Sequence, residues 1–377
     1  MSKKIRIAAL GDIAVLQEPK KEIWKGVMED ADIRLANLEA PIVENPGPPA
    51  AKMVRMKQPP ATASWLKALN INAVSLANNH MLDWGVEGLE QTCQFLNEVG
   101  ILHTGAGNNL EEAKEPLFLN IDGYKIAFIS WSSTVPPGFQ ALENRPGIAS
   151  VRVKSSFQVD SSILDEQPGT PPWIDTEPVE EDLLLLEETI KSVRTRADFV
   201  ILAMHWGVPP QWSSVPQDPI AEYQKIVAKR VVNVGVDVII GHHSHAPYGL
   251  ETYIVETNEK KVVPVLYSLG NYIFHPEFFP NGFDQSTFHV PYTFSMVPEN
   301  HQSCLAELIL DVDPTSNKLM LEKVIIHPAM LDEIGEAVEG TSQQKQLVAE
   351  RLHQFSQKRG ANTELIDQKI VLKVREL

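Results

Sequence analysis

Short apolar segments that end in polar residues recur along the chain. The first covers residues 5–10 and leads directly into Gly11 and Asp12. Four more have the same form: residues 32–39, 72–77, 199–204 and 236–240. Apolar runs of this length, bounded by glycine or polar residues, are typical of buried strands. We therefore expect strands that each deliver a polar side chain at the carboxyl end.

Amphipathic segments separate these strands and predict helices. They cover residues 20–29, 61–69, 86–97, 180–195 and 220–232. Strands that alternate with helices favour an α/β fold with a largely parallel sheet, and ligands of such sheets gather at the carboxyl ends of the strands. The polar residues that follow the predicted strands should therefore converge.

The pattern changes at about residue 250. From there strand-like segments follow one another, up to a helix at 342–357 and a last strand at 370–374. No linker-like change in composition separates this region from the rest of the chain. We expect a single domain over residues 1–377, in which residues 5–275 carry the motifs and residues 276–377 complete the second sheet.

Three segments rich in proline interrupt the alternation and predict loops. Residues 155–181 are predicted to be a long loop or a lid, and residues 208–218 a second loop. Residues 45–60 are the third and carry Lys52, Arg55 and Lys57. These cations are candidates to hold an anionic substrate, and the alternative is a solvated surface loop.

Charge and composition narrow the class of partner. The 49 acidic and 33 basic side chains give a net charge of -16, which repels nucleic acid and anionic membranes. An anionic ligand therefore needs local cations, including bound metal. The chain shows no signal-peptide pattern, no apolar run of about 20 residues and only two cysteines. We expect a cytoplasmic protein with a small-molecule or short anionic substrate, of open oligomeric state.

The densest chemical signal is the run Gly241-His242-His243-Ser244-His245, directly after a predicted strand. Imidazoles two positions apart can turn toward one centre, and neutral imidazole binds Zn, Fe, Mn, Co or Ni. The alternative is a polar turn whose histidines face solvent. Matching ligand types at three other strand ends favour the metal site.

A second signal is Asn79-His80, followed by Asp83. The carboxamide oxygen of Asn79 can bind a hard cation, while His80 remains free for proton transfer. Asp83 is placed to hold the opposite ring nitrogen of His80 and so raise its basicity. Taken alone, the segment fits an Asn/His turn with helix capping equally well.

Three single residues complete the pattern at the predicted strand ends. His205 follows the strand at 199–204, and Asp12 and Glu39 end the first two strands. Carboxylates at these positions would balance the charge of divalent ions. The alternatives are a core histidine for His205 and helix caps for the two acids.

Together these motifs resemble the poly-γ-glutamate capsule biosynthesis (CapA-type) family of the calcineurin-like metallophosphoesterase superfamily. They occur in the family's order over residues 11 to about 274: Gly11-Asp12, Asn37-Leu38-Glu39, Ala77-Asn78-Asn79-His80 with Asp83 and Gly85, His205-Trp206-Gly207, Gly241-His242-His243-Ser244-His245 and Tyr267-Ser268-Leu269-Gly270-Asn271. The resemblance implies an α/β fold, a four-layer α/β/β/α sandwich of the metallo-dependent phosphatase type. It also implies two divalent metal ions, and we expect Mn, Fe or Zn.

The resemblance further implies a set of ligands. Asp12 and His245 would bind one metal, Glu39 would bridge, and the other metal would have three ligands: Asn79, His205 and His243. The wider superfamily has Asp-x-His as its first motif, whereas Asp12 is followed by Ile13 and Ala14. The first metal is therefore expected to have one imidazole fewer, which leaves that site weaker, more open to water or selective for another ion.

The remaining roles also follow from the resemblance. His80 would be the general acid, with Asp83 as its catalytic partner. Ser268 and Asn271 would shape the pocket wall behind the metals. His242, with no assigned role in the family, is expected to contact the substrate or the ligands.

Three functions fit this pattern. The first is a hydrolase that uses a dinuclear-metal hydroxide, most simply on a phosphoester. The second is an amide or peptide hydrolase, or a transferase, acting on a polyglutamate-related substrate, which needs a cationic groove that the net charge does not indicate. The third is a non-catalytic role in capsule-polymer biosynthesis, which normally implies a membrane anchor. We expect the first.

Overall fold

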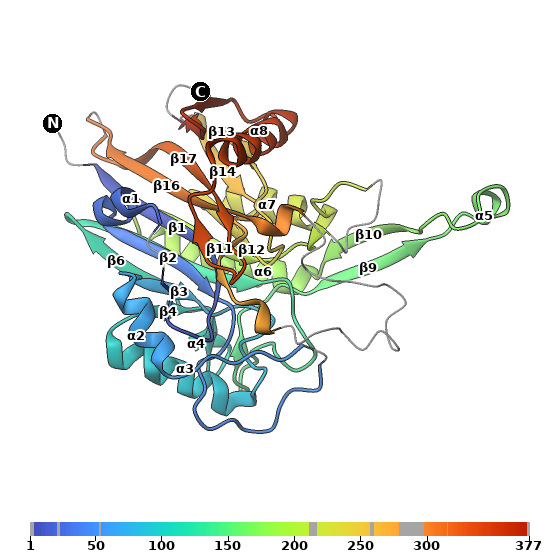
Figure 1. Cartoon of the computed structure of the whole chain (residues 1–377), viewed down its shortest axis with the longest axis horizontal. Coiled ribbons are helices and arrows are strands. Elements are labelled where there is room, and N and C mark those ends of the chain that lie inside the picture. The colour runs from blue at the N-terminus through green and yellow to red at the C-terminus, as the bar shows by residue number, and fades with distance from the viewer. Residues whose placement is uncertain are drawn as a thin grey trace.

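The computed structural model describes residues 4–20, 23–52, 54–210, 217–256, 260–278, 298–314 and 316–374 (Figure 1). Within these ranges the chain forms two large sheets that face each other. A smaller pair joins β5 (Ala106–Gly107) to β8 (Gly147–Ile148), and a two-stranded arm projects from the body.

The first large sheet is built around β1 (Ile5–Ala14), and we call it the β1 sheet. Parallel strands continue it on one side: β2 (Ile33–Leu38), β3 (Ala73–Ser75) and β4 (Leu102–Thr104). Antiparallel strands continue it on the other side: β16 (Gln302–Val312), β17 (Leu319–Leu331), β20 (Lys369–Lys373) and β19 (Thr363–Ile366). The C-terminal strands thus lie in the same sheet as the first strand of the chain, because β16 pairs with β1, and the prediction that residues 276–377 complete a second sheet is wrong.

Two short strands complete the β1 sheet. β15 (Asn271–Phe274) pairs in parallel with the end of β1, and β18 (Ala337–Val338) pairs with β17. Gly11 makes the first pairing possible, because a Cβ atom there would lie 2.0 Å from the carbonyl oxygen of Gly270. The close approach lets the backbone N–H of Asp12 donate to that oxygen at 3.0 Å and sets Asp12 beside Asn271.

The second large sheet is the β11 sheet. Its parallel centre consists of β14 (Lys260–Leu266), β12 (Val238–His242), β11 (Phe199–His205) and β7 (Tyr124–Ser132). Antiparallel edge strands close it on both sides: β13 (Leu250–Glu256) and β6 (Leu117–Ile121). Its centre is buried on both faces, which explains the unbroken apolar runs that the sequence shows there.

Apolar side chains between the two sheets form the central core. Ile7 and Leu35 of the β1 sheet share one buried cluster with Ile201 and Val238 of the β11 sheet. The last helix, α8 (Ser342–Lys358), joins this cluster through its buried face and packs against β17 and β13.

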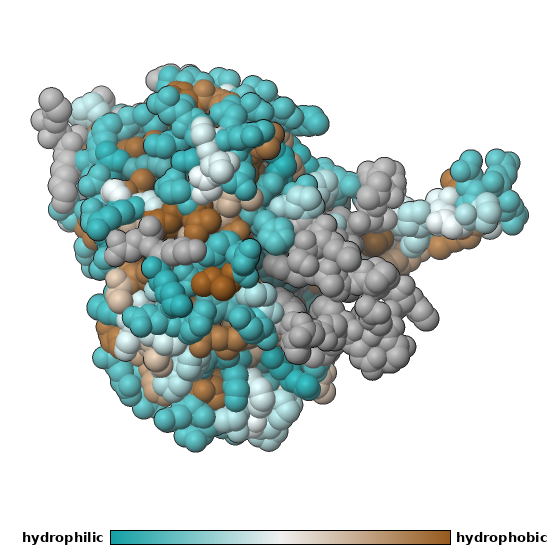
Figure 2. Space-filling model, viewed as in Figure 1, coloured by the Kyte–Doolittle hydropathy of each residue, from teal (hydrophilic) through white to brown (hydrophobic). Residues whose placement is uncertain are grey.

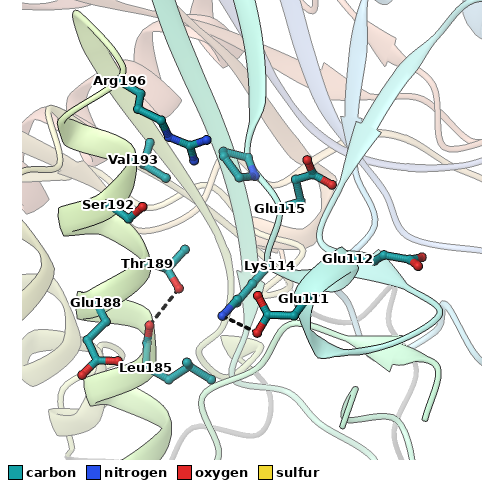
Figure 3. A pocket seen from close by; sticks show the side chains of 11 residues that line it. Glu111, Glu112, Lys114, Glu115, Leu185, Glu188, Thr189, Ser192, Val193 and Arg196 are labelled. Atoms are coloured by element: carbon teal, nitrogen blue, oxygen red, sulfur yellow. Dashed lines mark hydrogen bonds and ion pairs between the residues drawn. The ribbon is translucent and has the colours of Figure 1, made fainter. Parts of the chain in front are cut away.

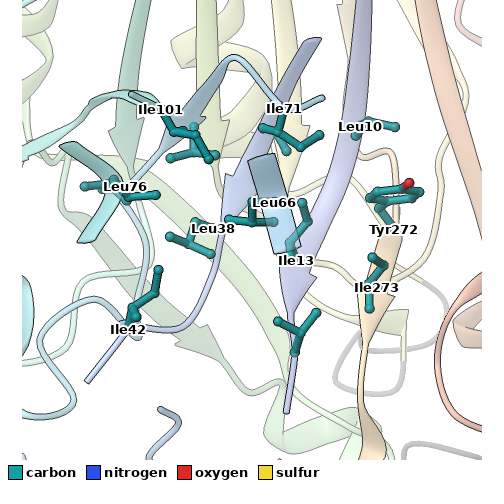
Figure 4. Close-up of a cluster of buried hydrophobic side chains, with 14 of the residues drawn as sticks. Leu10, Ile13, Leu38, Ile42, Leu66, Ile71, Leu76, Ile101, Tyr272 and Ile273 are labelled. Carbon is teal, nitrogen blue, oxygen red and sulfur yellow. The ribbon is translucent and has the colours of Figure 1, made fainter. Parts of the chain in front are cut away.

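Helices cover the outer face of each sheet. α2 (Ala61–Ala68) and α3 (Gly85–Val99) pack on the β1 sheet, where Leu66 meets Leu38 in the cluster of Figure 4. α6 (Glu180–Arg194) and α7 (Glu222–Val234) pack on the β11 sheet through Ile190 and Val227. The order is helix, sheet, sheet, helix, which confirms the predicted α/β/β/α sandwich.

Most predicted elements are present with shifted ends. The strands expected from the first five apolar segments are β1, β2, β3, β11 and β12. The helix expected at 20–29 is shorter: α1 covers Lys25–Asp30, and residues 21 and 22 lie outside the described residues. Residues 211–216 of the loop expected at 208–218 also lie outside them. The structure contains no helix, among the residues it describes, with the length and apolarity needed to cross a membrane.

The prediction of a long loop or lid at residues 155–181 is wrong. β9 (Val153–Gln158) and β10 (Trp173–Pro178) pair as an antiparallel arm, with the short helix α5 (Ser161–Glu166) near its tip (Figure 1). Three prolines lie between α5 and β10 and the fourth ends β10, so none interrupts the pairing. Apolar side chains remain exposed along the arm, including Phe157 at 65% and Trp173 at 52% (Figure 2).

Candidate metal centre

The carboxyl ends of the two sheets meet and bring together the six predicted ligands. β1 presents Asp12, Glu39 follows β2, and Asn79 lies in the turn after β3. The β11 sheet contributes three imidazoles from the end of β11 and the turn after β12: His205, His243 and His245. Each sheet therefore supplies three of the six residues.

Short distances join the two halves of this cluster. His205 Nε2 lies 2.8 Å from Asn79 Oδ1 and 3.7 Å from Glu39 Oε1. His245 Nε2 lies 3.6 Å from the same Glu39 oxygen, and its Nδ1 lies 3.8 Å from Asp12 Oδ2. One carboxylate oxygen of Glu39 thus lies between an imidazole of each predicted metal.

The third imidazole completes a compact donor set. Ligand atoms of Glu39, His243 and His245 all lie within 4.8 Å of one another. The rings of His205 and His243 have centroids 4.8 Å apart, and the backbone N–H of His243 donates to Asp12 Oδ2 at 3.0 Å. All six predicted ligands are therefore in one place.

The turn that carries two of the imidazoles has unusual backbone angles. His243 has a φ of 89° and His245 a φ of 55°, in the left-handed region that non-glycine residues rarely adopt. Strain of this kind persists where the surrounding structure holds it, and it is common at functional sites. Here it directs both side chains toward Glu39.

Burial sets the electrostatics of the cluster. Desolvation raises the pKa of Glu39 well above its ordinary value, and the nearby charge of Asp12 adds to this. Desolvation also raises the pKa of Asp12 to about 7 and lowers the pKa of His205, His243 and His245. The folded chain therefore favours neutral imidazoles, the form that binds metal.

The residues present fit a cationic group. Both carboxylate oxygens of Glu39 and the Nδ1 of His243 are buried without a hydrogen-bond partner in the described part of the chain. Buried polar atoms nearly always have a hydrogen-bond partner, so these unpaired atoms require an explanation. A divalent ion would satisfy them, since carboxylate, amide oxygen and imidazole suit Mn, Fe and Zn.

His80 lies beside the cluster in contact with Asp83. Its Nδ1 is 2.6 Å from Asp83 Oδ2, and the Nζ of Lys52 is 2.7 Å from Asp83 Oδ1. Burial lowers the pKa of His80, and Asp83 opposes this shift. Electrostatic interaction with His80 also lowers the pKa of His243 and His245, after the larger effect of their burial.

Two asparagines support the cluster, and the sequence had given neither of them a role. Asn37 donates to Asp12 Oδ1 at 2.8 Å, and its Nδ2 lies 3.3 Å from His205 Nδ1. Asn78 donates to the Asn37 side chain at 3.3 Å and to the Leu38 carbonyl at 2.8 Å. Only their positions in the sequence indicated a role: Asn78 directly precedes Asn79, and Asn37 lies two residues before Glu39.

The other predicted pocket residues are buried and contact protein groups. His242 is 2% exposed, and its Nε2 donates to the Leu10 carbonyl at 3.2 Å. Ser268 is fully buried and accepts the Gly270 N–H at 3.0 Å. Asn271 is also buried, with Oδ1 2.9 Å from His245 Nδ1, so it orients a predicted ligand.

The two exposed cations of the 45–60 segment lie apart from Lys52. Lys57 is exposed, with its Nζ 5.0 Å from the centre of the Trp84 ring, and Arg55 is exposed as well. Among the described residues, neither side chain forms a hydrogen bond or an ion pair with any of the six ligands. Lys52 alone of the three reaches the buried side of the site, where desolvation lowers its pKa.

A separate cavity of about 450 Å³ lies between α4 (Leu110–Ala113) and α6 (Figure 3). Its walls carry charges of both signs, including Glu111, Lys114 and Arg196. Glu111 and Lys114 neutralise each other at 2.8 Å. None of the six predicted ligands lines this cavity, so we do not assign the chemistry to it.

The sandwich and the cluster at its strand ends define a protein of the metallophosphoesterase-like class. The family described as bacterial capsule synthesis protein PGA_cap matches residues 7–276, and the chain belongs to this family. The match contains every predicted ligand and confirms the family that the sequence motifs resemble.

Individual relatives are distant. Uncharacterized protein y4sH of Sinorhizobium fredii is 28% identical over 253 residues, which cover 58% of this chain and 52% of the relative. Capsule biosynthesis protein CapA of Bacillus anthracis is 24% identical over 250 residues, 66% of this chain and 51% of the relative. The chain thus spans about half the length of the curated relatives it matches. A solved Staphylococcus aureus structure, named as a candidate 5′-nucleotidase, is 11% identical with a TM-score of 0.45 and covers 93% of this chain and 58% of that one.

Proposed function

We propose that the chain is a metal-dependent hydrolase that uses two divalent ions to cleave a phosphoester. The observation that carries the proposal is the environment of Glu39. Its carboxylate is fully buried, accepts no hydrogen bond from the described residues, and lies within 4 Å of an imidazole from each half of the predicted ligand set. An isolated buried carboxylate is strongly unfavourable, which supports a bound cation on either side of it.

The ligand geometry supports a division into two ions. Asp12 and His245 would hold one ion, and Glu39 would bridge to the other, held by Asn79, His205 and His243. Two bound divalent ions supply Lewis acidity at the attacked centre and a nucleophile at neutral pH. The missing imidazole after Asp12 leaves the first ion with fewer protein ligands.

The chain's own residues would handle the proton and exclude water. Asp83 accepts the Nδ1–H of His80, so in the doubly protonated ring the Nε2–H of His80 is free to donate its proton to the leaving oxygen. His80 is 6% exposed and Asp83 is fully buried, so the transfer would take place away from bulk water. The low pKa that burial gives His80 favours release of this proton.

The first test is the metal content and the hydrolytic activity of the purified chain. We expect two equivalents of transition metal by elemental analysis, and turnover of phosphomonoesters or phosphodiesters with added Mn²⁺. His80→Ala should lower kcat by about 10²- to 10⁴-fold, the usual range for a general acid. His103→Ala, which removes an imidazole outside the cluster, is the matched control and should leave kcat unchanged.

A second function is favoured by the family. The PGA_cap family and its Bacillus anthracis relative carry capsule synthesis in their names, so the same cluster could act on an amide of a polyglutamate-related substrate. Adding γ-glutamyl peptides to the assayed substrates distinguishes the phosphoester hydrolase from the amide hydrolase. Turnover of these peptides without turnover of phosphoesters would replace the first function by the second. A chain that retains no metal and binds none on titration would contradict both and favour a non-catalytic role.

A further inference from the structure

The segment before α2, residues 50–57, wraps around the turn that carries His80. The backbone N–H of Ala50 donates to the Asp83 carbonyl at 2.8 Å, and the Trp84 indole donates to the Met56 carbonyl at 3.0 Å. Lys52 reaches furthest inward, where its side chain is 17% exposed and its Nζ contacts the carbonyl oxygen of Asn79. One surface segment thus supplies a cation to the buried side of the site.

Asp83 is held by three donors, and two of them come from this segment. Its Oδ1 receives the Lys52 ammonium at 2.7 Å, and its Oδ2 receives the Met56 N–H at 2.7 Å and the His80 ring at 2.6 Å. The carboxylate is fully buried. Its rotation is therefore blocked on one oxygen by a charged partner and on the other by a backbone group.

The position of Lys52 also favours one tautomer of His80. The Nζ of Lys52 lies 3.3 Å from the Nδ1 of His80, but the ammonium can only donate. The Lys52 ammonium donates to Asp83 and to the carbonyl oxygen of Asn79, so the Nδ1 of His80 keeps its own proton for Asp83. The Nε2 of His80, on the other side of the ring, is then the nitrogen that takes up and releases the catalytic proton.

We infer that Lys52 is a positioning residue for His80, whose ammonium holds Asp83 in the orientation that accepts the Nδ1–H of His80. The inference rests on the proposed function, because proton transfer by His80 belongs to that function. Lys52 does not contact the reacting atoms in this arrangement. Its effect passes through Asp83 and should be largest where the leaving group needs a proton.

The test compares two substrates that differ in the need for that proton. In Lys52→Met we expect kcat for an alkyl phosphate to fall by about 10- to 100-fold, a part of the general-acid contribution. For p-nitrophenyl phosphate, whose leaving group departs as a stable anion, kcat should change by less than about threefold. A purely structural role of Lys52 would lower both rates equally and would overturn the inference.

Further variants separate a positioning role of Lys52 from a role in folding. Lys52→Arg keeps the charge and should recover most of the lost rate, while Lys67→Met removes an exposed lysine of α2 and should have no effect. Introduced into Asp83→Asn, Lys52→Met should cause no additional loss, because coupled residues are not additive. If Lys52→Met does not fold, Lys52→Gln removes the charge with a polar side chain and is measured in the same way.

A measurement without turnover distinguishes failure of this inference from failure of the proposed function. Nitrogen-15 spectra of the histidine rings, recorded on the full chain with Zn²⁺, report which nitrogen of His80 is protonated. We expect the Nδ1–H tautomer in the wild type and in Lys67→Met, and a mixture of tautomers in Lys52→Met. An unchanged tautomer in Lys52→Met would overturn the inference whether or not the chain hydrolyses phosphoesters.

Discussion

The Nε2 of His205 lies 2.8 Å from the Oδ1 of Asn79, although 126 positions separate the two residues in the chain. His205 ends β11 and Asn79 follows β3, so this hydrogen bond joins the carboxyl ends of the two sheets. Both atoms belong to the ligand set predicted for one metal. The fold therefore brings the two donors together before any ion is considered.

Glu39→Gln should make the thermal stability of the chain nearly independent of added metal. The neutral amide removes a buried carboxylate that has no hydrogen-bond partner in the described structure, so the metal-free variant should be more stable than the wild type by about 1–3 kcal/mol. Thermal unfolding after chelation measures this. Added Mn²⁺ should then raise the Tm of the wild type and hardly change that of the variant. Glu44→Gln, an exposed acid, is the control, and a metal-free Glu39→Gln less stable than the wild type would contradict the prediction.

Gly11→Ala should destabilise the fold by about 1–3 kcal/mol or more, because the new Cβ would lie 2.0 Å from the Gly270 carbonyl oxygen in the β1 sheet. Urea unfolding measures the loss. Gly26→Ala is the matched control, since nothing lies within 4 Å of its Cβ position in helix α1. Gly26→Ala should stabilise the fold by about 0.5–1 kcal/mol. Equal stability of the two variants would mean that β1 and β15 can separate at little cost.

Glu307 should contribute stability that depends on pH. Desolvation raises its pKa, but the hydrogen bond and charge of His327, together with Arg6, outweigh this and hold the pKa below its ordinary value. His327 Nε2 lies 3.0 Å from the Glu307 carboxylate, between β17 and β16. A lowered folded pKa stabilises above the unfolded pKa of about 4.3, and this stability is lost as the pH falls through the folded pKa.

Glu307→Gln tests whether the stability contributed by Glu307 is lost as the pH falls. The wild type should exceed the variant by about 2 kcal/mol in unfolding free energy at neutral pH, and the difference should shrink as the pH falls below the unfolded pKa. Urea unfolding at a series of pH values measures it. A difference that stays constant down to about pH 3 would show that the charge of Glu307 does not contribute.

The projecting arm should be dispensable for the stability of the body. α5 has no buried residue, and the outer parts of β9 and β10 are exposed. We propose replacing residues 158–173 by Asn-Gly, which joins the cross-strand pair Phe157 and Ile174 with a two-residue hairpin turn. The free energy of unfolding should change by less than about 1 kcal/mol. A large loss would show that the arm folds back on the body in solution.

The sequence predicts the elements that carry the cluster well, because a buried strand and its polar end are both local signals. The sequence predicts Asp12, Glu39 and His205 as single polar residues after apolar runs, and the structure places them together. The division into four layers came from the resemblance of the motifs, since periodicity alone does not determine which face of a sheet meets another sheet.

Other features depend on contacts that no local pattern encodes. The path of residues 50–57 determines that Lys52 reaches Asp83 while Lys57 stays exposed, although both were lysines of one predicted loop. The arm was missed because its prolines were read as loop signals without regard to where strands could fit between them. The hairpin of β6 and β7 carried a usable signal, Asp122-Gly123, whose positive φ values of 50° and 88° suit a two-residue turn.

The equal division of the six ligands between the two sheets has a kinetic consequence. An ion held at this edge would span the seam of the sandwich, and neither sheet alone provides the full donor set. Any opening that parts the sheets there would release the ion. The rate at which a strong chelator removes the metal would therefore be an upper limit on how often the sandwich opens at that end.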